Sequence, residues 1–188
     1  MVDILILYYS VNESTKKMAR LISRGVESVD GANAVLRTVK SDKNSHEDSD
    51  PIADTNDLKN CSGLILGSPT HFGNMASPLK GFLDKTTAEW LQGTLTGKPA
   101  GVFTSTSSMH GGQETTLISM MLPLLHHGML IVGVPYSEKS LISTKTGGTP
   151  YGPSHVSFNE SQDLSNDEKE ICKSFGARIA EITIKLNN

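Results

Sequence analysis

The chain has 188 residues, 37% hydrophobic and 20% charged, a balance typical of one globular domain with a sizeable core. Its formal net charge of −3 at pH 7 argues against nucleic-acid binding, which usually needs a basic patch, and against a strongly acidic carrier protein. No apolar run approaches the ~18 residues of a membrane span, and residues 1–10 lack the features of a signal peptide. We therefore expect a single domain over residues 1–188, soluble in the cytoplasm.

The first part of the chain alternates apolar strands with an amphipathic helix. Residues 3–10, DILILYYS, form an apolar run that predicts a strand buried on both faces, as in a parallel sheet. Apolar residues spaced three and four apart then predict a helix from residue 15 to residue 29. Next come a predicted strand at 33–39, a polar surface loop at 40–56, a short helical turn at 57–60 and a third strand at 63–67.

The second part repeats this alternation. Pro78 suits the first turn of a helix that begins near Ser77, because its missing N–H group costs little there. The remaining elements are predicted as a strand at 99–103, a helix at 115–126, a strand at 128–136, a long polar connection at 141–166 and a helix at 166–186.

Strands that alternate with helices predict a parallel sheet with helices on both faces. Sheets of this kind bind ligands at the carboxyl ends of their strands. Three of those ends carry polar, turn-rich segments, which we name the first loop (residues 10–15), the second loop (68–74) and the third loop (104–112). The sequence therefore predicts one binding pocket built from three loops.

The first loop, SVNEST, leads from a buried strand into a helix. The hydroxyl groups of Ser10, Ser14 and Thr15 lie beside the first N–H groups of that helix, which attract anions. The loop therefore either holds a phosphate group or simply caps the helix, since Ser and Thr do both. It contains neither a GxxxxGK[ST] nor a GxGxxG pattern, which favours a mononucleotide phosphate over a triphosphate or a dinucleotide.

The other two loops would suit a flat, polar ligand. The second loop, SPTHFGN, offers ring surface from His71 and Phe72 and hydrogen-bonding groups from Thr70 and Asn74. A Phe that follows a strand more often belongs to the core, so its assignment stays open. The third loop, TSTSSMHGG, carries five hydroxyl residues and then two glycines that permit close backbone approach. Together the loops would accommodate a phosphate, a polyol and a ring.

Few residues outside the loops stand out. Trp90 either belongs to the core or covers a flat ligand, and His126 precedes Gly128 at a helix end, where the dipole favours a histidine. Cys61 and Cys172 form no CxxC pattern, which favours two buried or half-buried thiols over a disulfide. No metal is expected, because no cluster of His, Cys, Asp and Glu has ligand spacing.

Several segments resemble the WrbA family: LILYYS, LGSPTHFGNMASPLKGFLD, VFTSTSSMHGGQET, LLHHGML and GGTPYG. The resemblance runs from about residue 4 to residue 186. The family consists of flavodoxin-like FMN proteins with NAD(P)H:quinone oxidoreductase activity, and general flavodoxins lack the combination of GSPT-x-FGNM with HHGM. The resemblance implies a three-layer α/β sandwich with a five-stranded parallel sheet of order 2-1-3-4-5, helices on both faces and FMN at its carboxyl edge.

The resemblance also implies roles for individual residues. FMN would be bound by residues of the three loops and by a histidine: Ser10, Val11, Asn12, Glu13, Ser14, Thr15, Pro69, Thr70, His71, Phe72, Gly73, Asn74, Ser105, Thr106, Ser107, Ser108, His110, Gly111 and His126. His126 would lie near the flavin ring, from a neighbouring subunit or the same pocket wall, and would be the catalytic proton source. Trp90 would line the substrate site, and a homotetramer, a dimer of dimers, would complete the pockets.

Two residues depart from the family pattern. Glu13 stands where a glycine is usual, and a side chain at a position with positive φ costs roughly 1 kcal/mol. Its carboxylate would also repel a phosphate unless it points to water, so FMN binding should be weaker than in the family. His71 stands where an arginine is common, which would lower FMN affinity or change the flavin potential.

The implied reaction is a two-electron reduction of quinones by NADH or NADPH through ping-pong hydride transfer, with FMN supplying the chemistry. One alternative is a one-electron carrier of the flavodoxin type, which the mild charge argues against, because such carriers dock through strongly acidic surfaces. The other is a flavin-poor interaction protein in which Glu13 has disabled the phosphate site. The sequence separates neither NADH from NADPH nor one acceptor from another.

Overall fold

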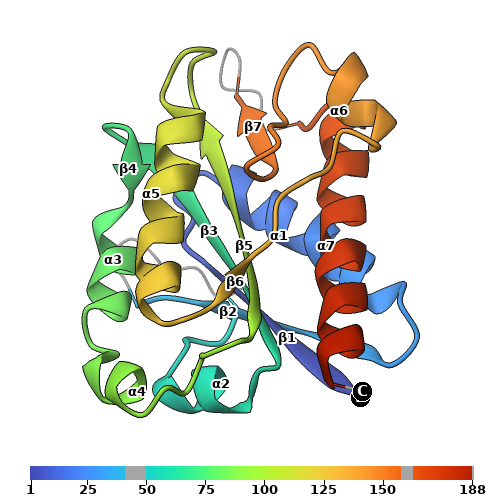
Figure 1. Ribbon diagram of the computed structural model, residues 1–188. Coiled ribbons are helices and arrows are strands. Elements are labelled where there is room, and N and C mark those ends of the chain that lie inside the picture. Colours follow the sequence, from blue (N-terminus) through green and yellow to red (C-terminus); the bar gives the residue numbers. More distant parts are fainter. Residues whose placement is uncertain (41–49, 158–162, 188) are drawn as a thin grey trace.

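A mostly parallel sheet forms the middle layer of the computed structural model, which describes residues 1–40, 50–157 and 163–187 (Figure 1). The strand order is β2-β1-β3-β5-β6. These strands are β1 (Val2–Tyr8), β2 (Ala32–Thr38), β3 (Gly63–His71), β5 (Pro99–Thr106) and β6 (Leu130–Ile131). Because β5 and β6 are the predicted fourth and fifth strands, the flavodoxin-like order 2-1-3-4-5 is confirmed.

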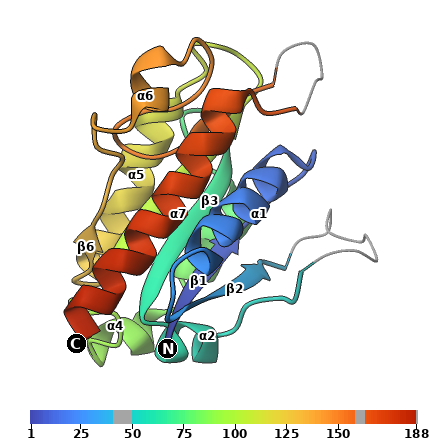
Figure 2. The ribbon, with the colours of Figure 1, turned by 90° about the vertical axis from the view of Figure 1, so that its right-hand side faces the viewer.

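Helices cover both faces of this sheet, as predicted. One face carries α1 and α7, which lie side by side (Figures 1 and 2), and the other carries α3 and α5. The helices are α1 (Ser14–Glu27), α2 (Thr55–Asn60), α3 (Ser77–Leu83), α4 (Thr87–Leu91), α5 (Gln113–His126), α6 (Lys139–Ser143) and α7 (Asn166–Asn187). None of these helices is long and apolar enough to cross a membrane.

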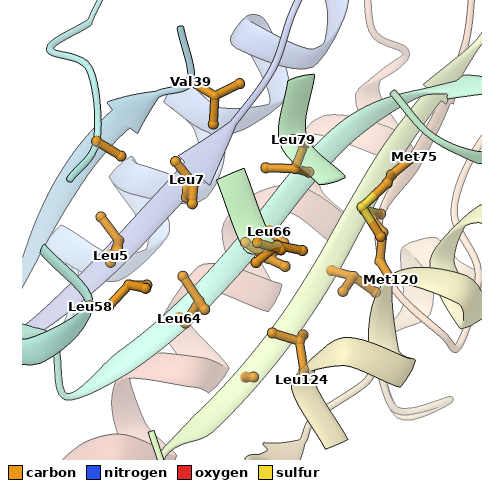
Figure 3. Packing of buried hydrophobic residues seen from close by; sticks show 14 of the residues in the cluster. Leu5, Leu7, Val39, Leu58, Leu64, Leu66, Met75, Leu79, Met120 and Leu124 are labelled. Atoms are coloured by element: carbon orange, nitrogen blue, oxygen red, sulfur yellow. The ribbon is translucent and has the colours of Figure 1, made fainter. Parts of the chain in front are cut away.

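The core divides into two clusters because successive side chains of a strand point to opposite faces. On the α3 and α5 face, Leu64 and Leu66 of β3 pack with Leu79 and Met120 from the helices (Figure 3). On the other face, Ile65 of the same strand joins the apolar residues of α1 and α7. Burial on both faces accounts for the continuous apolar runs in the sequence.

Helices α1 and α7 approach each other closely at two glycines. A Cβ atom on Gly25 would lie 2.0 Å from the carbonyl oxygen of Lys173, and one on Gly176 would lie 2.1 Å from the carbonyl oxygen of Ile22. Only a residue without a side chain allows the two backbones to come this near. These glycines therefore set the position of α1, whose first turn belongs to the first loop.

The second loop differs from the prediction. β3 continues through Gly67 to His71 and pairs with the antiparallel strand β4 (Asn74–Met75), so most of the expected turn is a hairpin. Gly67 does not end the strand; its missing side chain makes room for the ring of Phe103, which an added Cβ would approach to 2.0 Å.

The far edge of the sheet also differs. The predicted strand at 128–136 is limited to β6, which pairs with the first residues of β5. Further along β5, its partner is β7 (Ser154–Val156), which lies inside the connection predicted to be only polar. Just after β6, the carbonyl oxygen of Pro150 lies 2.3 Å from where a Cβ atom on Gly133 would be, so only glycine allows the connection to pack this closely there. Residues 41–49 of the predicted loop lie outside the described residues.

The glycine contact between α1 and α7 generates a stability prediction. Gly176→Ala should lower the free energy of unfolding by about 1–3 kcal/mol or more, because the added methyl group forces two backbones apart. The matched control is Gly81→Ala in α3, where nothing lies within 4 Å of the new methyl group and Ala should stabilise the helix by up to about 1 kcal/mol. Denaturant unfolding measures both, and equal effects would contradict this account.

Candidate functional site

The strand register brings the starts of the three loops together. Tyr8 of β1 lies beside Gly67 of β3, and Gly67 lies beside Phe103 of β5. Side-chain hydrogen bonds then join the loops themselves. Thr15 Oγ1 lies 2.9 Å from Ser105 Oγ, and Thr70 Oγ1 lies 3.1 Å from Thr104 Oγ1. The predicted three-loop arrangement is therefore present at the carboxyl edge of the sheet.

The first loop holds Glu13 in a left-handed conformation, with φ of 63°. The sequence predicted a position of this kind, and Glu13 is the N-cap of α1 without a side-chain capping hydrogen bond. Its carboxylate lies 3.2 Å from Lys16 Nζ and is 48% exposed. The negative charge is therefore partly compensated and open to water, which reduces its repulsion of an anion at the helix start.

The second loop is a tight hairpin whose tip carries Phe72. Phe72 and Gly73 both have positive φ, at 51° and 74°, the conformation of a two-residue type I′ turn. Phe72 is fully exposed, so the alternative that it belongs to the core is wrong. Asn74 accepts a hydrogen bond of 3.0 Å from Ser119 of α5, which fixes the hairpin against that helix. A bulky residue held in a strained conformation at a loop tip is typical of a functional position.

The third loop is tied to the start of α5. Gln113 is buried and its side-chain amide donates to the carbonyls of Ser108 and Met109, at 3.2 and 2.9 Å. Gly112, with φ of 91°, lies so close to the hairpin that an added Cβ would be 3.0 Å from Gly73 Cα. The second and third loops therefore touch at two glycines.

The structure separates the predicted site residues into two groups. Those of the three loops lie together at the carboxyl edge: Ser10, Val11, Asn12, Glu13, Ser14, Thr15, Pro69, Thr70, His71, Phe72, Gly73, Asn74, Ser105, Thr106, Ser107, Ser108, His110 and Gly111. Trp90 of α4 and His126 of α5 lie elsewhere. Figure 1 shows β4 and β7 at the top of the molecule and α4 at the bottom.

The length of α5 makes this separation large. Helix α5 starts beside the third loop and ends at His126, and its 14 residues span about 20 Å at 1.5 Å each. At the far end, the indole Nε1 of Trp90 donates to the carbonyl of His126 at 2.8 Å. The possibility that His126 lines the same pocket wall as the loops of its own chain is therefore wrong.

Sequence reasoning missed a polar group behind the first loop. Ser157 follows β7, and its Oγ lies 3.0 Å from Ser14 Oγ. Two residues earlier, His155 lies beside Ser105 in the sheet, and its Nδ1 is 3.1 Å from both carboxylate oxygens of Glu168. Both His155 and Glu168 are almost fully buried. The connection that carries β7 therefore supports the first and third loops from behind.

Glu168 is held in its ionised form by its hydrogen bonds. Burial alone would raise the pKa of this carboxyl group, but donation from His155 and from the backbone N–H groups of Ser165 and Gly147 lowers it below its usual value. The hydrogen bond from Ser165 N–H to Glu168 Oε2 is 2.7 Å long, and in return Ser165 Oγ accepts a hydrogen bond from Glu168 N–H at 3.2 Å. The sequence carried this signal as S-x-x-E, a capping box at the start of α7.

Both cysteines belong to the hydrophobic core. Cys61 and Cys172 are both free and buried, as predicted, and burial raises the pKa of the Cys61 thiol to about 11. Among the described residues, no three His, Cys, Asp or Glu side chains are arranged to hold a metal ion.

Comparisons with known proteins agree with this geometry. The family model for NADPH-dependent FMN reductase matches residues 2–139. A protein of Solidesulfovibrio magneticus named NAD(P)H dehydrogenase (quinone) is 36% identical over 98% of both chains. A protein of Geobacter sulfurreducens with the same name is 38% identical over 98% of this chain and 99% of its own.

The chain belongs to the NADPH-dependent FMN reductase family. The resemblance to WrbA-type quinone oxidoreductases is confirmed by these relatives. Among solved structures, a WrbA-like flavodoxin from Agrobacterium tumefaciens has a TM-score of 0.71 at 24% identity and covers 98% of this chain and 99% of its own. A flavodoxin from the domain Archaea has a TM-score of 0.67 at 20% identity, covering 97% and 99%. At these identities the two structures support the fold.

The ionised Glu168 generates a pH prediction. Its folded pKa lies below its unfolded value, so its stabilisation is present above the unfolded value, about 4.3, and is lost as pH falls through the folded value. Glu168→Gln should cost about 1–3 kcal/mol near neutral pH, and the difference from the unchanged protein should shrink below about pH 4. Denaturant unfolding at several pH values measures this. A difference independent of pH would contradict the assignment.

Proposed function

We propose that this chain is an FMN-dependent NAD(P)H:quinone oxidoreductase that carries out two-electron reduction in two successive half-reactions. The observation that carries the proposal is the joining of three polar loops at one sheet edge by the Thr15–Ser105 and Thr70–Thr104 hydrogen bonds. Family membership supplies the cofactor class, and the relatives named NAD(P)H dehydrogenase (quinone) support the donor and the acceptor. A cytoplasmic location stays a prediction.

The residues present fit FMN. The Glu13 side chain does not cap α1, and only Ser10 Oγ is recorded as accepting from its first turn, from Lys16 N at 3.4 Å, among the described residues. The first N–H groups of α1 and the hydroxyls of Ser10, Ser14 and Thr15 would therefore hold the phosphate. The hairpin and the third loop would hold the ribityl chain and the flavin ring, with Phe72 at the ring's exposed side. When bound, FMN supplies the redox chemistry by accepting electrons from NAD(P)H and passing them to the quinone. The protein orients both substrates and restricts access of water.

Neither alternative function is favoured by the site. A one-electron carrier would need a strongly acidic docking surface, and the net charge is only −3. A flavin-poor interaction protein would need Glu13 to disable the phosphate site. However, the Glu13 carboxylate pairs with Lys16 and is half exposed, so the start of α1 stays open to an anion.

The separation of Trp90 and His126 from the loops supports self-association into a homotetramer. A single chain cannot place His126 near a flavin held by its own loops, whereas a neighbouring subunit can. Helix α5 carries an exposed apolar stripe of Ile118, Leu122 and Leu125, whose surfaces are 43%, 55% and 54% exposed. Their spacing of four and three positions places them on one face of the helix. Such a stripe is typical of a protein–protein interface. We propose that it packs against other copies of the chain and that Trp90 and His126 complete a neighbour's site.

The proposed function is tested by titrating the purified chain with FMN and following flavin absorbance and thermal unfolding. FMN at 100 times its dissociation constant should stabilise the fold by about 2.7 kcal/mol. The loaded protein should oxidise NADH or NADPH with benzoquinone, with parallel lines in double-reciprocal plots. A colourless protein without a thermal shift, or one that binds FMN and reduces no quinone, would contradict the proposal.

Glu13 should weaken FMN binding through its backbone and its charge. Glu13→Gly removes both the backbone strain and the charge. It should stabilise the fold by about 1 kcal/mol, because the left-handed position no longer carries a side chain. Glu13→Gln keeps the side chain and removes only the charge. Tighter FMN binding by both variants would assign the effect to charge, and tighter binding by the glycine variant alone would assign it to the backbone. No change in either variant would refute the predicted penalty.

Assembly should depend on the α5 stripe. Leu122→Asp should reduce the assembly to smaller species in sedimentation velocity, because it places a charge in an apolar contact. FMN affinity should fall only modestly, because most of its predicted contacts come from the three loops of one chain, while quinone reduction should fall at least tenfold as Trp90 and His126 leave the neighbour's site. Leu186→Asp, at an equally exposed leucine near the end of α7, is the control. A fully active Leu122→Asp monomer would rule out the shared site.

A further inference from the structure

Glu13 occupies a backbone conformation that its residue type disfavours. Its φ of 63° lies in the left-handed region, where a side chain comes too close to the backbone. The Glu13 side chain makes no capping hydrogen bond to α1 that would offset this strain. Strain of this kind persists only where the surrounding structure holds the backbone in place. The contacts of the neighbouring residues therefore decide whether this turn keeps its shape.

The two residues after Glu13 are each anchored by a hydroxyl group from beyond the first loop. Ser14 Oγ lies 3.0 Å from Oγ of Ser157, which follows β7, and Thr15 Oγ1 lies 2.9 Å from Ser105 Oγ at the end of β5. Ser14 and Thr15 are both buried, so their hydroxyl groups need partners within the protein. Because these residues form the first turn of α1, the two hydrogen bonds hold that turn against the sheet.

The anchor that follows β7 is itself firmly held. Ser157 N donates to the carbonyl of Thr106 in β5 at 2.8 Å. Immediately before Ser157, the carboxylate of Glu168 in α7 accepts from Val156 N at 3.4 Å and from His155 Nδ1 at 3.1 Å. His155 and Glu168 are 1% and 2% exposed. The backbone that carries Ser157 is therefore bound to β5 on one side and to α7 on the other.

We propose that Ser157 is a positioning residue for the FMN phosphate, and that it acts by holding Ser14 and the strained Glu13 turn. This inference rests on the proposed function, and family membership supplies the ligand. A phosphate at the start of α1 would be bound by N–H groups whose directions depend on the backbone of residues 13–15. Without the Ser157 anchor, Glu13 would relax out of the left-handed region and turn these groups away from the phosphate.

The first test compares FMN with riboflavin, which has the same ring and ribityl chain but no phosphate. The full chain is titrated with each flavin while flavin absorbance and fluorescence are followed. Ser157→Ala should weaken FMN binding about tenfold through the loss of one hydrogen bond, and should leave the dissociation constant of riboflavin unchanged. Ser157→Thr keeps the hydroxyl group and should restore FMN binding. Equal losses for the two flavins, or no loss for FMN, would overturn the proposal.

Ser154→Ala is the matched control for a general loosening of β7. Ser154 lies in the same strand, and its hydroxyl group accepts from Gly148 N at 2.8 Å, in the connection before β7 rather than in α1. Its replacement should lower the thermal stability without changing the ratio of the FMN and riboflavin dissociation constants. A change in this ratio as large as that in Ser157→Ala would overturn the specific role of Ser157.

The second test asks whether Ser157 acts through Glu13. Glu13→Gly removes the strain, because glycine adopts positive φ readily, so the anchor has less to hold. In the Glu13→Gly background, Ser157→Ala should weaken FMN binding by less than about twofold, because the two residues are coupled. An equal loss with Glu13 and with glycine at this position would contradict the proposal, since Ser157 would then act independently of the Glu13 turn.

This inference and the proposed function would fail in different ways. If the unchanged protein binds FMN and reduces quinone while Ser157→Ala binds FMN equally well, only the role of Ser157 falls. If the unchanged protein binds FMN and reduces no quinone, the proposed activity falls, and the flavin titrations still decide the role of Ser157. If the unchanged protein binds no FMN, both fall.

Discussion

The alignment of Tyr8, Gly67 and Phe103 across three parallel strands determines where every loop of the site begins. The missing side chain of Gly67 allows this alignment, because the Phe103 ring occupies the space that a Cβ would need. Beyond these three aligned residues, β1 leads into the first loop and α1, β3 continues into the hairpin, and β5 continues into the third loop. The hydroxyl contacts between loops, such as Thr15 with Ser105, follow from strand register rather than from loop sequence.

The same alignment separates the site into two parts. The loops occupy the carboxyl edge, and each helix that starts there runs back toward the opposite edge, as parallel β-α-β connections require. His126 and Trp90 lie where α5 has finished that return. Residues at the two ends of one helix can meet a single ligand only if different copies of the chain supply them. The exposed α5 stripe, through which we propose that copies of the chain associate, lies between the two ends.

Periodicity predicted the strands and helices well wherever burial was uniform. The runs that became β1 and β3 are apolar because both of their faces are covered, and the helical spacing of α1 reflects one buried face. The hairpin was missed because Gly67 and Pro69 are usual ends of a strand, whereas here Gly67 admits a neighbouring ring. β7 was missed because three residues in a polar connection give no periodic signal; only pairing with β5 makes them a strand.

The site was predictable where one loop determines its own geometry. The positive φ of Glu13 was predictable because a glycine is usual at this position in the family. The meeting of the three loops was predictable because parallel strands end at one edge of the sheet. Contacts made by tertiary packing, such as that of His155 with Glu168, were not predictable from the sequence. Only the capping box of Ser165 and Glu168 was visible there as an indirect indication. The neighbours His126 and His127 show the limit most clearly. Consecutive helical positions point in different directions, so one is exposed and the other is buried against Thr86. Two residues of the same type therefore differ in burial and in hydrogen-bonding partners because of their surroundings alone.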